Sequence, residues 1–240
     1  MEEFSAHRSR TNLLGEFRAI LFDLDGTLVD TAPDLLFALN QVIVEEGGDK
    51  PLLSLGDIRP LVSHGGRAMV QRGFGITPEG PGFARLFERF LNAYRDNIAN
   101  HTRLFPGMER VLAQIEVRTM LWGVVTNKSG WLANPLMAAL GLAHRAACIV
   151  SGDTTVHRKP YPDPLLFACR QLGTIPKHCL YIGDAARDIE AGLRAGMHTA
   201  VALFGYVSSS EEPERWGADY VFSSPRDIFD WLVDSSFSMV

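Results

Sequence analysis

Two aspartates follow directly on the first apolar segment of the chain. Residues 19–22 read Ala-Ile-Leu-Phe, and Asp23-Leu-Asp25-Gly26-Thr comes next. The short apolar run predicts a buried strand of a parallel sheet, and Gly26 allows the sharp turn that must follow. Carboxylates at the carboxyl end of such a strand lie where open α/β sheets bind ligands, and two of them repel each other unless a cation such as Mg²⁺ lies between them. The pattern indicates a cation site from which an aspartate attacks phosphorus; the alternative is a plain Asp-Gly turn closing the strand.

Three later segments repeat this arrangement, in which an apolar run is followed by polar or charged side chains. The pattern gives Thr126 and Asn127 after residues 120–125, Lys159 after the run at 148–150, and Asp184 and Asp188 after residues 180–182. Loops that follow separate strands of one parallel sheet converge at its carboxyl edge, so these side chains are expected to meet there. Asp184 and Asp188 share one face if a helix begins between them.

The four segments, in this order, make the chain similar to phosphatases of the haloacid dehalogenase (HAD) superfamily, and among these to the phosphoglycolate phosphatase group. The family's first motif matches residues 23–29, its second Thr126, its third Lys159 before Pro160, and its fourth the Gly-Asp-x-x-x-Asp of residues 183–188. The resemblance implies an α/β fold with a Rossmann-like parallel sheet core (HAD-like) and an inserted all-helical cap domain. Ala185 stands where relatives often carry a small hydroxyl residue, which removes one possible hydrogen bond but no metal ligand.

This resemblance implies hydrolysis of a phosphate monoester through an aspartyl-phosphate intermediate. Asp23 would be the nucleophile, and Asp25 would protonate the leaving alcohol and then deprotonate the attacking water. Thr126 and Lys159 would stabilise the phosphoryl oxygens, and Asn127 would supply a further donor.

The resemblance also implies a Mg²⁺ cofactor at the acidic residues. Asp23 and Asp184 would bind it through their carboxylates and Asp25 through its backbone carbonyl, with water completing the shell. Asp188 would orient one or more of these waters. Lys128 is left without an assigned role, a solvated side chain being one interpretation of it.

A second candidate substrate contact lies in the segment Val-Ser-His64-Gly65-Gly66-Arg67. Two glycines before a helix let backbone N–H groups approach an anion, and Arg67 can clamp a carboxylate or phosphate. We therefore expect His64, Gly66 and Arg67 to contact substrate. The alternative is a helix-breaking loop with a solvated arginine and a structural histidine.

The spacing of apolar residues predicts the order of the elements. Helices are expected over residues 34–46, 55–61, 68–74, 83–98, 108–117, 131–140, 164–172, 188–195 and 226–233, and strands over 19–22, 120–125, 148–150, 180–182, 199–203 and 220–222. Helices alone fill the region after the first strand, so residues 31–104 are interpreted as the cap. Residues 18–30 and 105–240 then form the core, and residues 1–17 an N-terminal extension.

Composition narrows the function classes. The chain has 240 residues, 46% of them hydrophobic, and a formal net charge of -5, which argues against nucleic acid as a partner. No segment has the length and apolarity of a membrane span or a signal peptide, so a cytoplasmic protein without membrane contact is expected, as monomer or homodimer. The three cysteines lack zinc-site spacing and are expected to be buried.

Other functions that occur on similar scaffolds differ in which of these residues they require. A dehalogenase needs neither Mg²⁺ nor Asp25, a phosphomutase is separated only by its products, and a phosphorylated receiver domain lacks both the helical insertion and the second acid. The expected partner is a small-molecule phosphate ester, 2-phosphoglycolate or a similar small metabolite. The alternative substrate is the 6-phosphate of N-acetylmuramic acid, because residues 64–70, 122–128 and 216–219 are similar to phosphatases that act on that sugar in cell-wall recycling.

Overall fold

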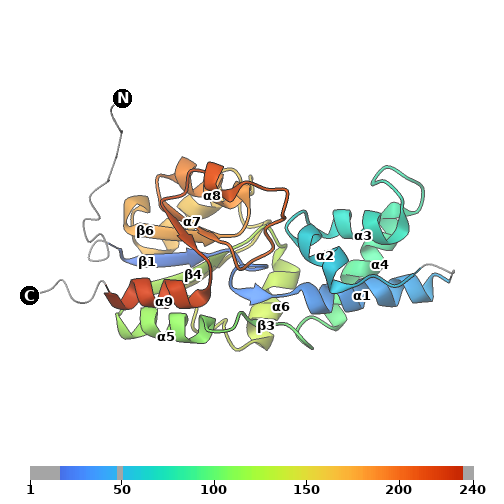
Figure 1. Cartoon of the computed structure of the whole chain (residues 1–240), viewed down its shortest axis with the longest axis horizontal. Helices are drawn as coiled ribbons and strands as arrows, with labels where there is room; N and C mark the ends of the chain where they lie inside the picture. Colours follow the sequence, from blue (N-terminus) through green and yellow to red (C-terminus); the bar gives the residue numbers. More distant parts are fainter. Residues whose placement is uncertain (1–16, 48–50, 235–240) are drawn as a thin grey trace, which may run out of the picture.

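A six-stranded parallel sheet lies at the centre of the larger part of the molecule (Figure 1). The computed structural model describes residues 17–47 and 51–234. The strands are β1 (Ala19–Phe22), β4 (Leu121–Val125), β5 (Cys148–Val150), β6 (Cys179–Gly183), β7 (His198–Ala202) and β8 (Tyr220–Phe222). They lie in the order β5-β4-β1-β6-β7-β8, and each neighbouring pair is parallel. The predicted α/β fold with a Rossmann-like sheet is confirmed.

Helices cover both faces of the sheet, which explains why its inner strands are apolar and buried. They are α5 (Met108–Val117), α6 (Gly130–Ala139), α7 (Asp163–Leu172), α8 (Ala186–Ala195) and α9 (Pro225–Asp234), with short 3₁₀ turns at Pro176–His178 and Pro213–Arg215. Helices α5 and α9 pack together on one face, and α7 and α8 pack together on the other (Figure 1). These elements follow the predicted ones to within about two residues at each end.

Strand register fixes where the candidate site lies. Strand β1 is central, and Phe22 at its end pairs with Val124 of β4 and Ile182 of β6. The chain therefore leaves three adjacent strands at nearly the same level. Asp23 and the residues after β4 and β6 emerge side by side at one edge of the sheet.

A second group of helices lies beyond this edge (Figure 1). It consists of α1 (Ala32–Glu45), α2 (Leu55–Val62), α3 (Gly66–Phe74) and α4 (Phe83–Asp96). Buried residues on one side of α1, among them Leu39 and Val42, face α4, whose Phe90 and Tyr94 are fully buried. Each helix presents one apolar face to the others, and their buried side chains continue into the apolar cluster on one face of the sheet.

A two-stranded antiparallel ribbon that the sequence pattern does not predict connects the two parts. It pairs β2 (Val29–Asp30) with β3 (Arg103–Leu104), so the last residues of the segment interpreted as all-helical are extended. Two-residue strands show no alternation that a sequence pattern can reveal. Beside the ribbon, buried Asp34 accepts hydrogen bonds from the backbone N–H groups of His101 and Thr102, which ties the start of α1 to the returning chain. The boundaries at 31 and 104 stay a prediction.

Three smaller expectations can be compared with the fold. Residues 1–16 of the expected extension lie outside the described residues, whereas Phe17 is buried against His198 and Trp231 at ring distances of 5.1 and 5.7 Å. The three cysteines are buried and free, as predicted. Among the described residues, no helix has the length and apolarity that crossing a membrane requires.

Candidate active site

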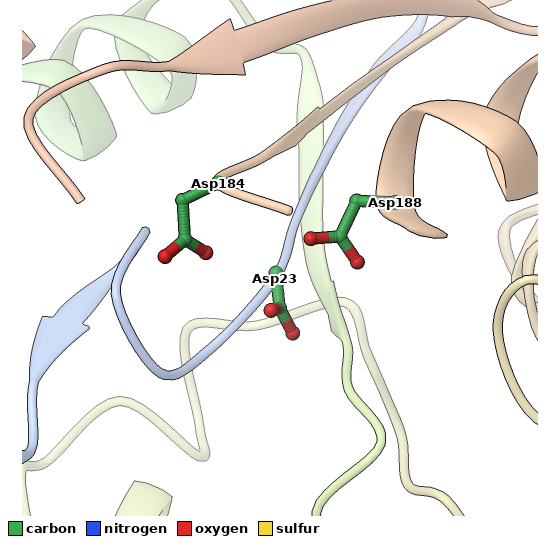
Figure 2. A group of neighbouring side chains, drawn as sticks. All are labelled: Asp23, Asp184 and Asp188. Carbon is green, nitrogen blue, oxygen red and sulfur yellow. The ribbon is translucent and has the colours of Figure 1, made fainter. Parts of the chain in front are cut away.

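Three buried aspartates from separate elements meet at the carboxyl edge of the sheet (Figure 2). Asp23 follows β1, Asp184 follows β6, and Asp188 lies in the first turn of α8. One carboxylate oxygen from each lies within 4.8 Å of the others. Helix α8 begins between Asp184 and Asp188, which turns both carboxylates toward Asp23, as Figure 2 shows.

The loops around Asp184 hold its carboxylate in place. The Thr27 hydroxyl donates to its Oδ1 at 3.0 Å, and the backbone N–H of Tyr206 donates to its Oδ2 at 2.8 Å. Gly26 has a φ of +89°, and a Cβ added there or at Gly205 would overlap the Asp184 side chain. Gly26 is thus required both for the turn and for the space that the carboxylate occupies.

The Lys159 ammonium lies at the centre of the acidic residues. Its Nζ is 2.8 Å from Asp23 Oδ1 and 2.8 Å from Asp188 Oδ1. It also contacts the Val125 carbonyl at 2.9 Å and the Tyr181 hydroxyl at 2.7 Å, and that hydroxyl donates to the same carbonyl at 2.9 Å. The side chain of Lys159 is fully buried. Four polar neighbours hold the Lys159 ammonium in one position. That position is beside the carboxylate of Asp23.

The residues after β4 support Lys159. The Asn127 side-chain amide accepts the N–H of Lys159 at 3.0 Å and donates to its carbonyl at 2.9 Å. Thr126 is buried, and its hydroxyl accepts the N–H of Lys128 at 3.1 Å. Asn127 thereby fixes the backbone of Lys159 in addition to lining the cavity described below. Its predicted contact with substrate stays a prediction.

The charges of this group are unbalanced. Burial raises the pKa of Asp23 to about 6, and Lys159 only partly offsets that effect. Burial, reinforced by Asp23 and Asp188, raises the pKa of Asp184 to about 8. Burial alone would lower the pKa of Lys159, but the Asp188 and Asp23 carboxylates raise it instead.

One ammonium among three carboxylates leaves two formal negative charges, which a divalent cation would neutralise. The converging donors are all oxygens, the ligands that hard cations prefer. The residues therefore fit a metal ion held by Asp23 and Asp184, with Asp188 beside it. Asp25 is not among the three converging carboxylates, and its expected contribution through the backbone carbonyl stays a prediction.

The Asp25 carboxylate points to a different set of partners. Its Oδ1 accepts the Lys128 ammonium at 2.8 Å and the Thr31 hydroxyl at 2.7 Å. The Lys128 side chain is only 9% exposed. This burial excludes the interpretation of Lys128 as a solvated side chain, and the ring of Tyr94, a residue of the second helical group, lies against its ammonium.

A cavity of about 560 Å³ lies between the sheet edge and the second helical group, and both Asp23 and Asp25 line it. His64, Gly66 and Arg67 also line this cavity, and their expected contact with substrate stays a prediction. Gly66 packs closely on the rings of Phe87 and Phe90, the Arg67 guanidinium lies 5.3 Å from the centre of the Phe87 ring, and His64 Nδ1 lies 3.1 Å from the Pro60 carbonyl. Ser63 of the same loop donates to Asp184 Oδ2 at 3.3 Å. The loop thus contacts the acidic group directly.

A family model for haloacid dehalogenase-like hydrolases matches residues 20–202, more than half of the chain. The chain belongs to the haloacid dehalogenase-like hydrolase family. The matched region includes the three converging aspartates and Lys159, which agrees with the resemblance inferred from the four motifs.

Individual members of the family cover nearly the whole chain. An N-acetylmuramic acid 6-phosphate phosphatase of Pseudomonas putida is 44% identical over 88% of this chain and 94% of its own. A phosphoglycolate phosphatase of Xanthomonas campestris is 39% identical over 89% of this chain and 95% of its own. Among solved structures, a predicted phosphoglycolate phosphatase from Haemophilus somnus superposes with a TM-score of 0.78 at 27% identity, covering 90% of this chain and 97% of that one.

Several residues that the site uses were not found from the sequence. Tyr181 lies inside a strand, Tyr206 lies in a loop after β7, and Tyr94 lies in the middle of an amphipathic helix. Each has the appearance of an ordinary core aromatic residue. Arg158 and Arg187 also line the cavity, and their position beside Lys159 and Asp188 in the sequence is a signal that could have indicated them.

The raised pKa of Asp184 predicts how stability depends on pH. Because the folded pKa of about 8 exceeds the ordinary 3.8, the folded protein binds this proton more tightly than the unfolded chain. The resulting stabilisation is complete below about pH 4 and is lost as the pH rises through about 8. Without added metal, Asp184→Asn should therefore unfold at a higher temperature than the wild type at pH 8, with the difference shrinking toward pH 5. For a chain of this size, each 1 kcal/mol of relief raises the melting temperature by roughly 2–4 °C.

Thermal unfolding by circular dichroism in EDTA at the two pH values measures this difference. Adding Mg²⁺ at pH 8 should raise the melting temperature of the wild type and have little effect on Asp184→Asn. An Asn fits the site because the Thr27 hydroxyl can rotate to accept its amide. A variant that is less stable than the wild type at pH 8 in EDTA would contradict the raised pKa.

Proposed function

We propose that this protein is a Mg²⁺-dependent phosphate-monoester hydrolase that forms an aspartyl-phosphate on Asp23. The arrangement of its two acids carries the proposal. Asp23 lies among the metal-binding carboxylates and beside Lys159, whereas Asp25, two residues later, is held separately by Lys128 and Thr31. Both line one cavity, so a nucleophile and a proton donor face the same space.

The residues of the chain then perform two displacements at phosphorus. In the first, an Asp23 oxygen bonds to phosphorus as the bond to the leaving oxygen breaks, and Asp25 gives that oxygen its proton. In the second, Asp25 takes a proton from water, the water oxygen bonds to phosphorus, and the Asp23 carboxylate leaves with release of inorganic phosphate. Lys159 and Thr126 stabilise the phosphoryl oxygens. A bound Mg²⁺ would neutralise charge on Asp23 and the phosphoryl group.

Two candidate substrates have support among the relatives. The first is 2-phosphoglycolate or a similar small phosphorylated metabolite, supported by the phosphoglycolate phosphatases among the relatives. The second is N-acetylmuramic acid 6-phosphate, supported by two relatives of 44% and 42% identity that bear that name. The cavity of about 560 Å³ has Phe87, Phe90 and Trp131 in its wall, and a two-carbon ester would fill only a small part of it. This volume favours the sugar phosphate.

A panel of phosphate esters tests the proposal. We expect release of inorganic phosphate with Mg²⁺ and its loss in EDTA, with the catalytic efficiency kcat/KM ranking the candidate substrates. N-acetylmuramic acid 6-phosphate should exceed 2-phosphoglycolate by at least tenfold if the cavity selects for size. Phosphate release that persists unchanged in EDTA would contradict the metal dependence, and a higher efficiency for 2-phosphoglycolate would contradict the size argument.

We also infer that residues 31–104 are a cap over a core formed by residues 18–30 and 105–240. The ribbon at Val29–Asp30 and Arg103–Leu104 supports this division, because it is where the chain crosses between the two groups of elements. A cytoplasmic monomer or homodimer stays a prediction.

A further inference from the structure

The Lys128 side chain connects the α/β core and the helical cap through a single ammonium group. Lys128 follows β4 in the core, and its Nζ lies 2.8 Å from Asp25 Oδ1. The same Nζ lies 4.6 Å from the centre of the Tyr94 ring, on α4 of the cap. The ammonium thus contacts both the proposed acid and the cap.

Burying this lysine is costly unless its neighbours compensate. Burial alone would lower the pKa of Lys128, but Asp25 and then Tyr94 raise it well above its ordinary value. Lys128 is therefore charged in the folded protein. Tyr94 itself is fully buried, and its hydroxyl makes no hydrogen bond of ordinary geometry to any described residue. The ring face, 4.6 Å from the Lys128 ammonium, is a favourable environment for a desolvated cation, and the nearby hydroxyl also favours the charged form.

The contacts of Lys128 also determine which Asp25 oxygen can act. Lys128 and the Thr31 hydroxyl both bind Oδ1 of Asp25, at 2.8 and 2.7 Å. Two tethers on one oxygen fix the rotation of the carboxylate and leave Oδ2 for the substrate. Thr31 lies next to α1 of the cap in sequence, so both tethers depend on residues at the junction of the two parts.

We propose that Lys128 is a positioning residue that, held in place by the ring of Tyr94, fixes Asp25 in the orientation needed to protonate the leaving group. The inference rests on the proposed phosphate-ester hydrolysis and adds to it two residues that the four motifs do not include. Lys128 also lines the cavity, but its ammonium is directed at Asp25 and Tyr94. Its effect passes through Asp25 and is therefore largest where Asp25 must supply a proton.

Two esters with different leaving groups separate this role from a structural one. An alkyl phosphate, for example 2-phosphoglycolate or a sugar 6-phosphate, needs a proton on its leaving oxygen. The p-nitrophenolate of p-nitrophenyl phosphate leaves without one. The quantity kcat/KM reports the steps up to formation of the aspartyl-phosphate, so the ratio of the two kcat/KM values measures how effectively Asp25 acts as an acid.

We expect Lys128→Met to lower kcat/KM for the alkyl ester about 100-fold and for p-nitrophenyl phosphate less than about tenfold. Tyr94→Leu should change the ratio in the same direction, whereas Tyr94→Phe, which keeps the ring, should preserve it. The double variant Lys128→Met/Tyr94→Leu should have a ratio no lower than that of Lys128→Met alone, because both substitutions break the same chain of contacts from Tyr94 through Lys128 to Asp25. The exposed Lys177 supplies a matched control, because Lys177→Met should leave the ratio unchanged.

Equal losses on both esters in Lys128→Met would overturn the inference, as would a Tyr94→Phe ratio that falls as far as that of Tyr94→Leu. Melting temperatures show whether each variant is folded. If Lys128→Met fails to fold, the comparison of Tyr94→Leu with Tyr94→Phe decides the question alone. A wild-type protein that hydrolyses neither ester would instead refute the proposed function.

Discussion

Asp23→Asn is expected to abolish turnover of phosphate esters while leaving the protein folded. An amide cannot form the bond to phosphorus, and loss of a catalytic nucleophile typically lowers kcat by about 10⁴- to 10⁶-fold. The fold should survive because an Asn carbonyl can still accept the hydrogen bond that Lys159 donates to Oδ1 at 2.8 Å. Removing a carboxylate whose pKa burial raises to about 6 should also relieve repulsion near neutral pH.

Steady-state phosphate release and thermal unfolding of the same preparation test both halves of this prediction. We expect no phosphate release above background and a melting temperature in EDTA at least equal to that of the wild type. Asp153→Asn is a suitable control, because Asp153 is exposed and bonds only the N–H of Gly130 among the described residues. Substantial Mg²⁺-dependent activity in Asp23→Asn would remove Asp23 from the role of nucleophile.

Lys159→Met is expected to damage both activity and stability. Loss of one group that stabilises transferring oxygens costs about 2.7–4 kcal/mol, or roughly 10²- to 10³-fold in kcat. In addition, the Asp23 and Asp188 carboxylates lose the buried ammonium that lies 2.8 Å from each. An uncompensated buried charge typically costs about 3–5 kcal/mol of unfolding free energy.

Urea unfolding in EDTA measures the stability half, and phosphate release measures the activity half. The double variant Lys159→Met/Asp188→Asn should recover much of the stability without recovering the activity, because it removes one carboxylate but restores no cation. The deficit in stability should be smaller at pH 5 than at pH 8, since protonated acids need no partner. A loss of activity of only twofold in Lys159→Met would place Lys159 outside the catalytic group.

Lys159 also shows why this site is held so firmly. The carboxylates, Lys159 and Tyr181 contact one another at short distances, and each comes from a different loop or strand. The network can form only when β1, β4 and β6 are in register, so the stability of the sheet and the geometry of the acids depend on each other. A polar network of this kind is destabilising when one member is missing and specifies a single arrangement when complete.

The sequence by itself determined the order of the elements and the residues of the sheet edge. Apolar runs predicted all six strands of the sheet, because a strand covered on both faces must be apolar along its length. The same runs located Asp23, Lys159 and Asp184, because chemistry at a parallel sheet is confined to the loops after the strands. The two short strands of the ribbon were missed because two residues carry no period.

Only the tertiary structure decided which of these side chains act on one another. Lys128 and Lys159 are both lysines after strands, yet the fold pairs Lys159 with Asp23 and Asp188 and pairs Lys128 with Asp25 and the ring of Tyr94. Tyr94 lies on an amphipathic helix, at a position where the apolar spacing predicts a core residue. The neighbouring residues in the sequence give no sign that it contacts the site. The physical reason is that the free energy of a buried charge depends on its neighbours in the folded protein, and these neighbours are far away along the chain.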